Sequence, residues 1–155
     1  MKSAFTMIEL VFIIVVLGIL SAVAFPKMAP FLEDAKIARG QSNVSAIRSA
    51  IANERAKNML NGTVAYPQIL DDAAQDTENE SLFDGNATVN MLQYPLYSKA
   101  TGGNWMKKSA NGANTTYRYY ISDARFVDFN YTRATGIFDC LHNAANNNDC
   151  ALLTK

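Results

Sequence analysis

Residues 5–25 read FTMIELVFIIVVLGILSAVAF, an apolar stretch of 21 residues in which Glu9 is the only charged side chain. A helix rises about 1.5 Å per residue, so this stretch is roughly 30 Å long, the thickness of the hydrocarbon core of a bilayer. It can therefore span a membrane. The hydrophilic bulk of the chain follows it, so a single pass with the C-terminal part outside the cytoplasm is the simplest topology.

Two other interpretations of this stretch stay open. An ordinary signal peptide would use Lys2 as its basic start, residues 10–20 as its apolar centre and Ala22-Val23-Ala24 as its small-x-small cleavage pattern. A plain membrane anchor would need only the length. Both leave Glu9 unexplained, because a carboxylate at the head of an apolar run adds insertion cost. In a signal peptide it would also have no use, since the segment is destined for removal.

The first residues also carry a resemblance to a known family. Ala4-Phe5-Thr6-Met7-Ile8-Glu9-Leu10, followed by a Val/Ile/Leu run with Gly18 and Pro26, resembles the N-terminus of type IV pilins and type II secretion pseudopilins. The family usually has Gly before the scissile bond, where this chain has Ala4. The resemblance implies that a prepilin peptidase cuts between Ala4 and Phe5 on the cytoplasmic side and methylates the new α-nitrogen of Phe5.

The resemblance also implies what the mature chain does. It would be a structural subunit of the inner membrane that polymerises into a helical homo-oligomeric filament, with Thr6 and Glu9 serving assembly. Its partners would be minor pilins or pseudopilins, the peptidase, an inner-membrane assembly platform and membrane lipid. The filament would be a type II secretion pseudopilus, a competence pseudopilus or a type IV pilus, and the small head favours the first two. The rival is a soluble periplasmic binding domain exported by cleavage after Ala24.

Beyond the apolar stretch, the pattern predicts that the helix continues to about Leu60. Apolar residues recur at three-, four- and seven-residue steps on one face, and basic residues lie opposite; the apolar ones are Ile37, Val44, Ile47, Ile51 and Met59, and the basic ones include Arg48 and Arg55. Asn61-Gly62 is a stop signal. Gly18, Pro26 and Pro30 predict a kink, the alternative being that the helix ends at Phe25.

The remaining chain predicts a small antiparallel sheet of three or four strands, which gives an α+β, pilin-like fold. Strands are expected at 117–121, 125–131 and 137–141, and a short helix around Met91. Trp105 is expected in the core. The segments are then a leader at 1–4, an apolar transmembrane and assembly helix at 5–25, an amphipathic helix at 26–60, a connecting region at 61–116, and the sheet with a disulfide-tied C-terminal loop at 117–155.

Cys140 and Cys150 are spaced to close a short loop by a disulfide, which fits an oxidising compartment; two unpaired thiols are the alternative. Asn86 is a candidate glycan acceptor, because Asp84-Gly85-Asn86-Ala87-Thr88 resembles the extended bacterial sequon.

The composition and the remaining residues argue against other functions. The 14 Lys and Arg balance the 14 Asp and Glu, which removes the electrostatic term that dominates nucleic-acid binding. His142 is the single histidine and no nucleophile motif accompanies it, so we expect no enzyme and no cofactor. Oxygen donors at Asp71, Asp72 and Asp76 and at 146–149 leave calcium as the alternative, although such runs are usually solvated turns.

Overall fold

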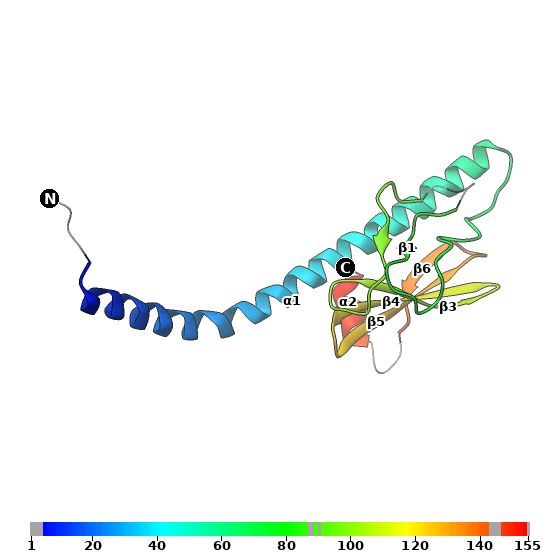
Figure 1. The fold of residues 1–155 in the computed structure, drawn as a ribbon. Coiled ribbons are helices and arrows are strands. Elements are labelled where there is room, and N and C mark those ends of the chain that lie inside the picture. The colour runs from blue at the N-terminus through cyan, green and yellow to red at the C-terminus, as the bar shows by residue number, and fades with distance from the viewer. Residues whose placement is uncertain (1–4, 87–88, 90, 143–146, 155) are drawn as a thin grey trace. The chain divides into compact units, whose positions relative to one another are not determined.

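The computed structural model describes residues 5–86, 89, 91–142 and 147–154. The chain divides into two units, Met1–Ala35 and Lys36–Lys155, and helix α1 contributes to both. Figure 1 labels the elements, which are α1 (Met7–Leu60), β1 (Ser81–Leu82), β2 (Leu96–Tyr97), β3 (Trp105–Asn111), β4 (Asn114–Ser122), β5 (Arg125–Thr132), β6 (Ile137–Cys140) and α2 (Asn147–Leu153).

Helix α1 runs through both prolines and ends where the Asn61-Gly62 pair predicts. Pro26 and Pro30 lie inside it, so the continuation past Phe25 is confirmed, while the bend at Gly18, Pro26 and Pro30 stays a prediction. At its end the backbone N–H of Gly62 donates to the carbonyl of Met59 (3.0 Å) and that of Thr63 to the carbonyl of Asn58 (2.9 Å). Gly62 has a φ of 79°. These are the two bonds of a Schellman motif, which satisfies the last carbonyls of the helix.

The second unit contains a four-stranded antiparallel sheet in the order β3-β4-β5-β6 and a separate β1-β2 pair. Inward residues alternate along β4 and β5, with Tyr117 opposite Phe129 and Tyr119 opposite Val127. The predicted strands are confirmed as β4, β5 and β6. Strand β3 falls in the segment that the sequence predicts to be connecting, because its polar run does not alternate.

Two local expectations were wrong. The short helix predicted around Met91 does not form, because Met91 and Leu92 donate their backbone N–H groups to the distant carbonyls of Asp84 and Phe83. Backbone bonds back to the segment that contains Phe83 and Asp84 therefore replace the i to i−4 bonds of a helix. In the C-terminal segment, predicted as a loop, residues 147–153 form α2 instead.

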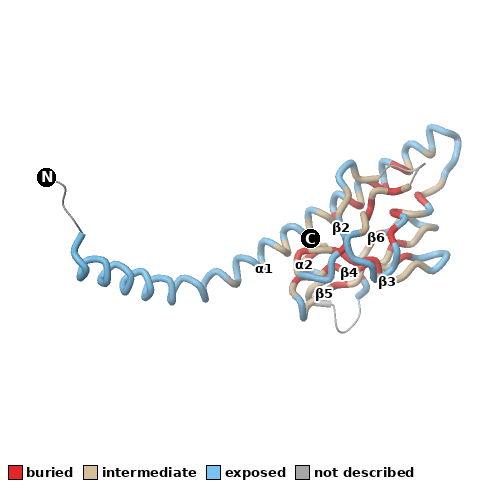
Figure 2. The backbone as a smooth tube through the Cα atoms, viewed as in Figure 1, coloured by how far each residue is buried: buried red, intermediate tan, exposed pale blue. Residues whose placement is uncertain are grey.

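The core of the second unit lies between α1 and the sheet. Figure 2 shows its buried residues in red. Val44, Ile47 and Ile51 of α1 are buried as predicted, and Trp105 is 1% exposed. Met59 is 52% exposed, so its predicted place on the packed face is wrong. Leu60 is exposed as well, so the apolar periodicity of α1 continues beyond the part that packs on the sheet.

Gly40 lets α1 approach both the sheet and α2. A Cβ added at Gly40 would lie 2.7 Å from Leu153 Cδ2 and 2.7 Å from Tyr119 Cε1. Around it the Tyr119 hydroxyl donates to the carbonyl of Lys36, and Gln41 Nε2 donates to the carbonyl of Leu152 (2.6 Å). The missing side chain at Gly40 therefore makes room for Leu153 and the Tyr119 ring against α1.

Gly40→Ala should lower the free energy of unfolding by about 1–2 kcal/mol. Alanine favours a helix by roughly 0.5–1 kcal/mol, but overpacking a filled core costs about 1–3 kcal/mol. Denaturant unfolding of the full chain in detergent would measure the difference. Gly112→Ala is the control, because an added Cβ meets nothing within 4 Å there. Equal stability of the two variants would contradict the close approach at Gly40.

Candidate functional site

The apolar N-terminal part of α1 exposes its side chains. Every described side chain from Phe5 to Leu32 is exposed, and Phe5 itself is 73% exposed. Within the described residues, α1 is the helix long and apolar enough to cross a membrane, with a mean hydropathy of 2.8 over its best 18 residues, none of which is buried. A signal sequence near the N-terminus meets the same criterion of length and composition.

Thr6 and Glu9 form the start of this helix. The backbone N–H of Glu9 donates to Thr6 Oγ1 (3.3 Å), and that of Leu10 donates to the Thr6 carbonyl (3.2 Å). Thr6 is therefore the N-cap of α1 and Glu9 its third residue, the Thr-x-x-Glu spacing of a capping box. The sequence already carries this signal, but the length and hydropathy of the apolar run do not reveal it.

The capping places the predicted cleavage point beside the helix start. Phe5 precedes the N-cap and is not helical. Ala4 lies outside the described residues. Glu9 also stands in the first turn of α1, where the helix dipole favours a negative charge.

The predicted disulfide is present and ties α2 to the sheet. Cys140 of β6 is bonded to Cys150 of α2, with 5.8 Å between their Cα atoms. A second link comes from Arg125 of β5, whose Nε donates to Asp149 Oδ2 (2.9 Å). His142 is exposed near this loop, as predicted.

The acidic residues of the first predicted oxygen-donor cluster have different partners in the structure. Asp71 is buried and pairs with Lys107, whereas Asp76 pairs with Lys108 near the surface. Asn146 and the side chains of Asn147 and Asn148 lie outside the described residues. Within those that are described, no group of three or more His, Cys, Asp or Glu could hold a metal ion.

The Asp71 carboxylate anchors the connecting region to the sheet. Its Oδ1 accepts from Lys107 Nζ (2.9 Å), and its Oδ2 accepts from the Tyr117 hydroxyl (2.8 Å) and from the backbone N–H of Phe83 (3.1 Å). Burial, and then the charge of Asp71, raises the pKa of Tyr117 well above its ordinary value, so the hydroxyl keeps its proton and donates. Phe83 has a φ of 59°, a strained value for a bulky residue, and its bond to Asp71 helps to hold it.

Asn86 lies in an irregular segment, half-buried. Its side-chain oxygen accepts from the backbone N–H of Val89 (2.7 Å). Thr88 of the sequon lies outside the described residues. The glycan at Asn86 stays a prediction.

A long, apolar, exposed N-terminal helix joined to a small antiparallel sheet is a pilin-like layout. Over 142 residues the chain is 22% identical to the Type IV major fimbrial protein FimA of Dichelobacter nodosus, and the match covers 88% of this chain and 90% of that one. This match supports the resemblance to type IV pilins that the first residues carry. No protein-family model matches the chain, and no solved structure matches it.

Lys107→Met should lower the free energy of unfolding by about 3–5 kcal/mol, because it leaves the buried Asp71 carboxylate without its cation. Lys108→Met is the matched control, since its partner Asp76 is 58% exposed, and it should cost less than about 1 kcal/mol. Denaturant unfolding of the two variants measures both values. Equal losses would show that Lys107 does not stabilise Asp71.

Proposed function

We propose that this chain is a membrane-inserted filament subunit, cut between Ala4 and Phe5 and polymerised through residues 5–25. The observation that carries the proposal is the apolar helix with no cover from the described chain, capped at Thr6 and followed by a folded head. The uncut helix would hold the subunit in the inner membrane. In the filament, sister helices would take the place of lipid, and the subunit would act in assembly rather than in catalysis.

Among the three filament types, the match to a major fimbrial protein favours a type IV pilus over the secretion or competence pseudopilus. This preference rests on what the relative is called and on the length of the match. The head alone would favour the smaller pseudopilins.

Glu9 would act as a register device during assembly. A carboxylate in an apolar environment is costly, and cleavage gives Phe5 an α-ammonium at the same end of the helix. If an incoming subunit lies one step below its neighbour, its Phe5 ammonium meets the neighbour's Glu9. Such a pair adds little net stability, but leaving either charge alone in the bundle costs several kcal/mol.

The mature N-terminus separates this function from the exported-domain rival. Cleavage by a prepilin peptidase should leave Phe5 as the first residue, with a methyl group on its α-nitrogen. Cleavage by a signal peptidase after Ala24 would leave Phe25. Intact-mass measurement and N-terminal sequencing of the membrane fraction distinguish the two, and Phe25 as the first residue would refute the filament subunit.

Glu9→Ala should still be cleaved and stay in the membrane, yet enter sheared filaments at least about tenfold less well, because the charge pair is lost. Glu9→Gln is the matched control, since glutamine also completes a capping box but carries no charge. Both variants should fail if the charge sets the register. Normal assembly of Glu9→Gln would show that Glu9 acts by capping its own helix instead.

A further inference from the structure

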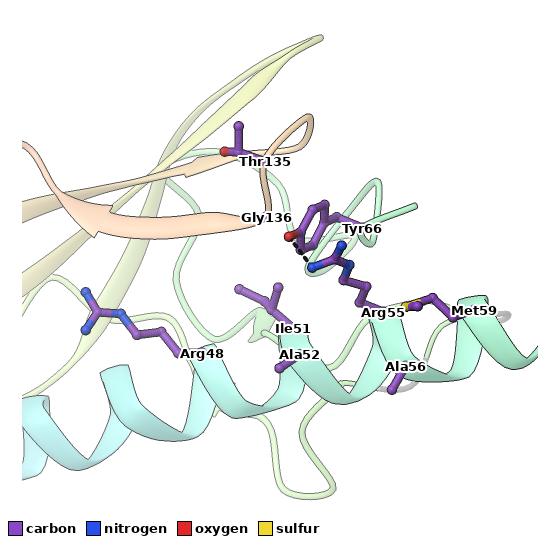
Figure 3. Close-up of a pocket in the computed structure, with 9 residues that line it drawn as sticks. All are labelled: Arg48, Ile51, Ala52, Arg55, Ala56, Met59, Tyr66, Thr135 and Gly136. Atoms are coloured by element: carbon purple, nitrogen blue, oxygen red, sulfur yellow. Dashed lines mark hydrogen bonds between the residues drawn. The ribbon is translucent and has the colours of Figure 1, made fainter. Parts of the chain in front are cut away.

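A pocket of about 430 Å³ opens between the end of α1 and the turn from β5 to β6 (Figure 3). Arg48, Arg55 and Met59 line it from α1, Tyr66 from the segment after the helix, and Thr135 and Gly136 from the turn. We call it the Arg55 pocket. Its mixture of arginine, tyrosine and methionine is typical of protein interfaces.

Arg48 and Arg55 do not lie on the face opposite the sheet, where the periodicity places them. Arg48 Nη2 pairs with Asp139 Oδ1 (2.9 Å), and its Nε donates to the Phe138 carbonyl (3.0 Å), both in β6. Arg55 likewise reaches toward the β5–β6 turn. Long side chains can extend from the flank of a helix to the neighbouring element, so the helical position alone does not fix where the charge lies.

Arg55 is held in place but carries an unbalanced charge. Its guanidinium carbon lies 4.4 Å from the centre of the Tyr66 ring, and Nη1 donates to the Tyr66 hydroxyl (2.6 Å). Its Nε is buried without a hydrogen-bond partner, and no carboxylate among the described residues pairs with it. Asp139 already pairs with Arg48, so Arg55 supplies the unpaired positive charge of the pocket.

The position of the Tyr66 ring depends on the absence of a side chain at Gly136. A Cβ at Gly136 would lie 2.0 Å from Tyr66 Cδ1, and its φ is 68°. The ring thus sits where a side chain on the turn would be, and it fixes the guanidinium before any partner arrives. A guanidinium fixed in this way loses little freedom on binding a carboxylate.

The opposite end of the same sheet presents an unpaired acid. Asp123 lies in the turn between β4 and β5, is exposed, and makes no ion pair within the described part of the chain. Two neighbouring acids are already paired, Asp128 of β5 with Arg118 of β4 and Asp149 of α2 with Arg125 of β5. Strand β5 separates the two ends by roughly 23 Å at about 3.3 Å per residue, so Asp123 cannot reach Arg55 of its own chain.

We propose that the Arg55 pocket receives the β4–β5 turn of a second copy, with the Asp123 carboxylate paired to Arg55. The two surfaces lie at opposite ends of one head, so the contact is heterologous and can repeat without closing a dimer. The exposed side chain of Met59 (52%), which lines the pocket, would be covered in the same step. The inference rests on the proposed filament and names a contact between its heads.

Cysteine cross-linking in intact filaments tests this contact without altering either charge. Ala56 is exposed and lines the pocket, and Ala124 is exposed beside Asp123. The native cysteines Cys140 and Cys150 are bonded to each other. In the full chain, Ala56→Cys with Ala124→Cys should give a ladder of covalent multimers after mild oxidation, because a bond within one chain would need Cα atoms within about 7 Å.

The control pairs Ala56→Cys with Ala113→Cys, which lies in the turn between β3 and β4 at the same end as the pocket. This pair should give no ladder. Filaments that form normally but give no ladder with the first pair would overturn the contact while leaving the proposed function intact. Cross-linking of Ala56→Cys to a different protein would overturn it as well. Failure of the unmodified chain to form filaments would instead refute the proposed function.

Charge-reversal variants test the pairing of Arg55 with Asp123 in a second way. Arg55→Glu and Asp123→Arg should each lower the yield of sheared filaments by about tenfold or more, since each places like charges together, and the double variant should recover most of it. Lys99→Glu reverses another exposed charge of the head and should assemble normally. Thermal melting in detergent checks that each variant folds. Additive losses in the double variant would overturn the pairing.

Discussion

The physical constraint on which this protein depends is the uncovered apolar surface of the first part of α1. A buried Leu, Ile or Phe side chain is worth about 1.5–3 kcal/mol relative to an exposed one, and this helix exposes a continuous run of such residues. The described chain does not cover that run. In the proposed filament subunit, lipid would cover this run before assembly and sister helices would cover it afterwards.

The second part of α1 solves the opposite problem, because it needs one apolar face only. Val44, Ile47 and Ile51 close the aromatic core of the sheet, and Gly40 admits Leu153 and the Tyr119 ring. The disulfide and the Arg125–Asp149 pair then hold α2 against the same core. The head therefore has its own core, to which the first part of α1 contributes nothing.

Two polar anchors show how differently charges are used in this head. Asp71 is buried and its hydrogen bonds come from Lys107, Tyr117 and the backbone, so it serves the fold. Arg55 is equally well positioned by Tyr66, but the described chain gives it no carboxylate. A charge satisfied within the chain stabilises, whereas a positioned charge without a counter-ion is available for recognition.

The sequence by itself determined the features that arise from local chemistry. Residues 5–25 are apolar whatever they contact, Asn61-Gly62 ends a helix through its own backbone, and Val127, Phe129 and Tyr131 alternate along one strand. Thr6 and Glu9 belong to this group, since a capping box is read from four consecutive residues. Only the tertiary structure decided the rest. The burial of Asp71 with Lys107 and the Arg55 pocket join residues that are far apart in sequence. Strand β3 depends on its pairing with β4, and the non-helical course of Met91 depends on backbone bonds to Asp84 and Phe83. The local pattern of a sequence holds no information on which partner will satisfy a given polar group.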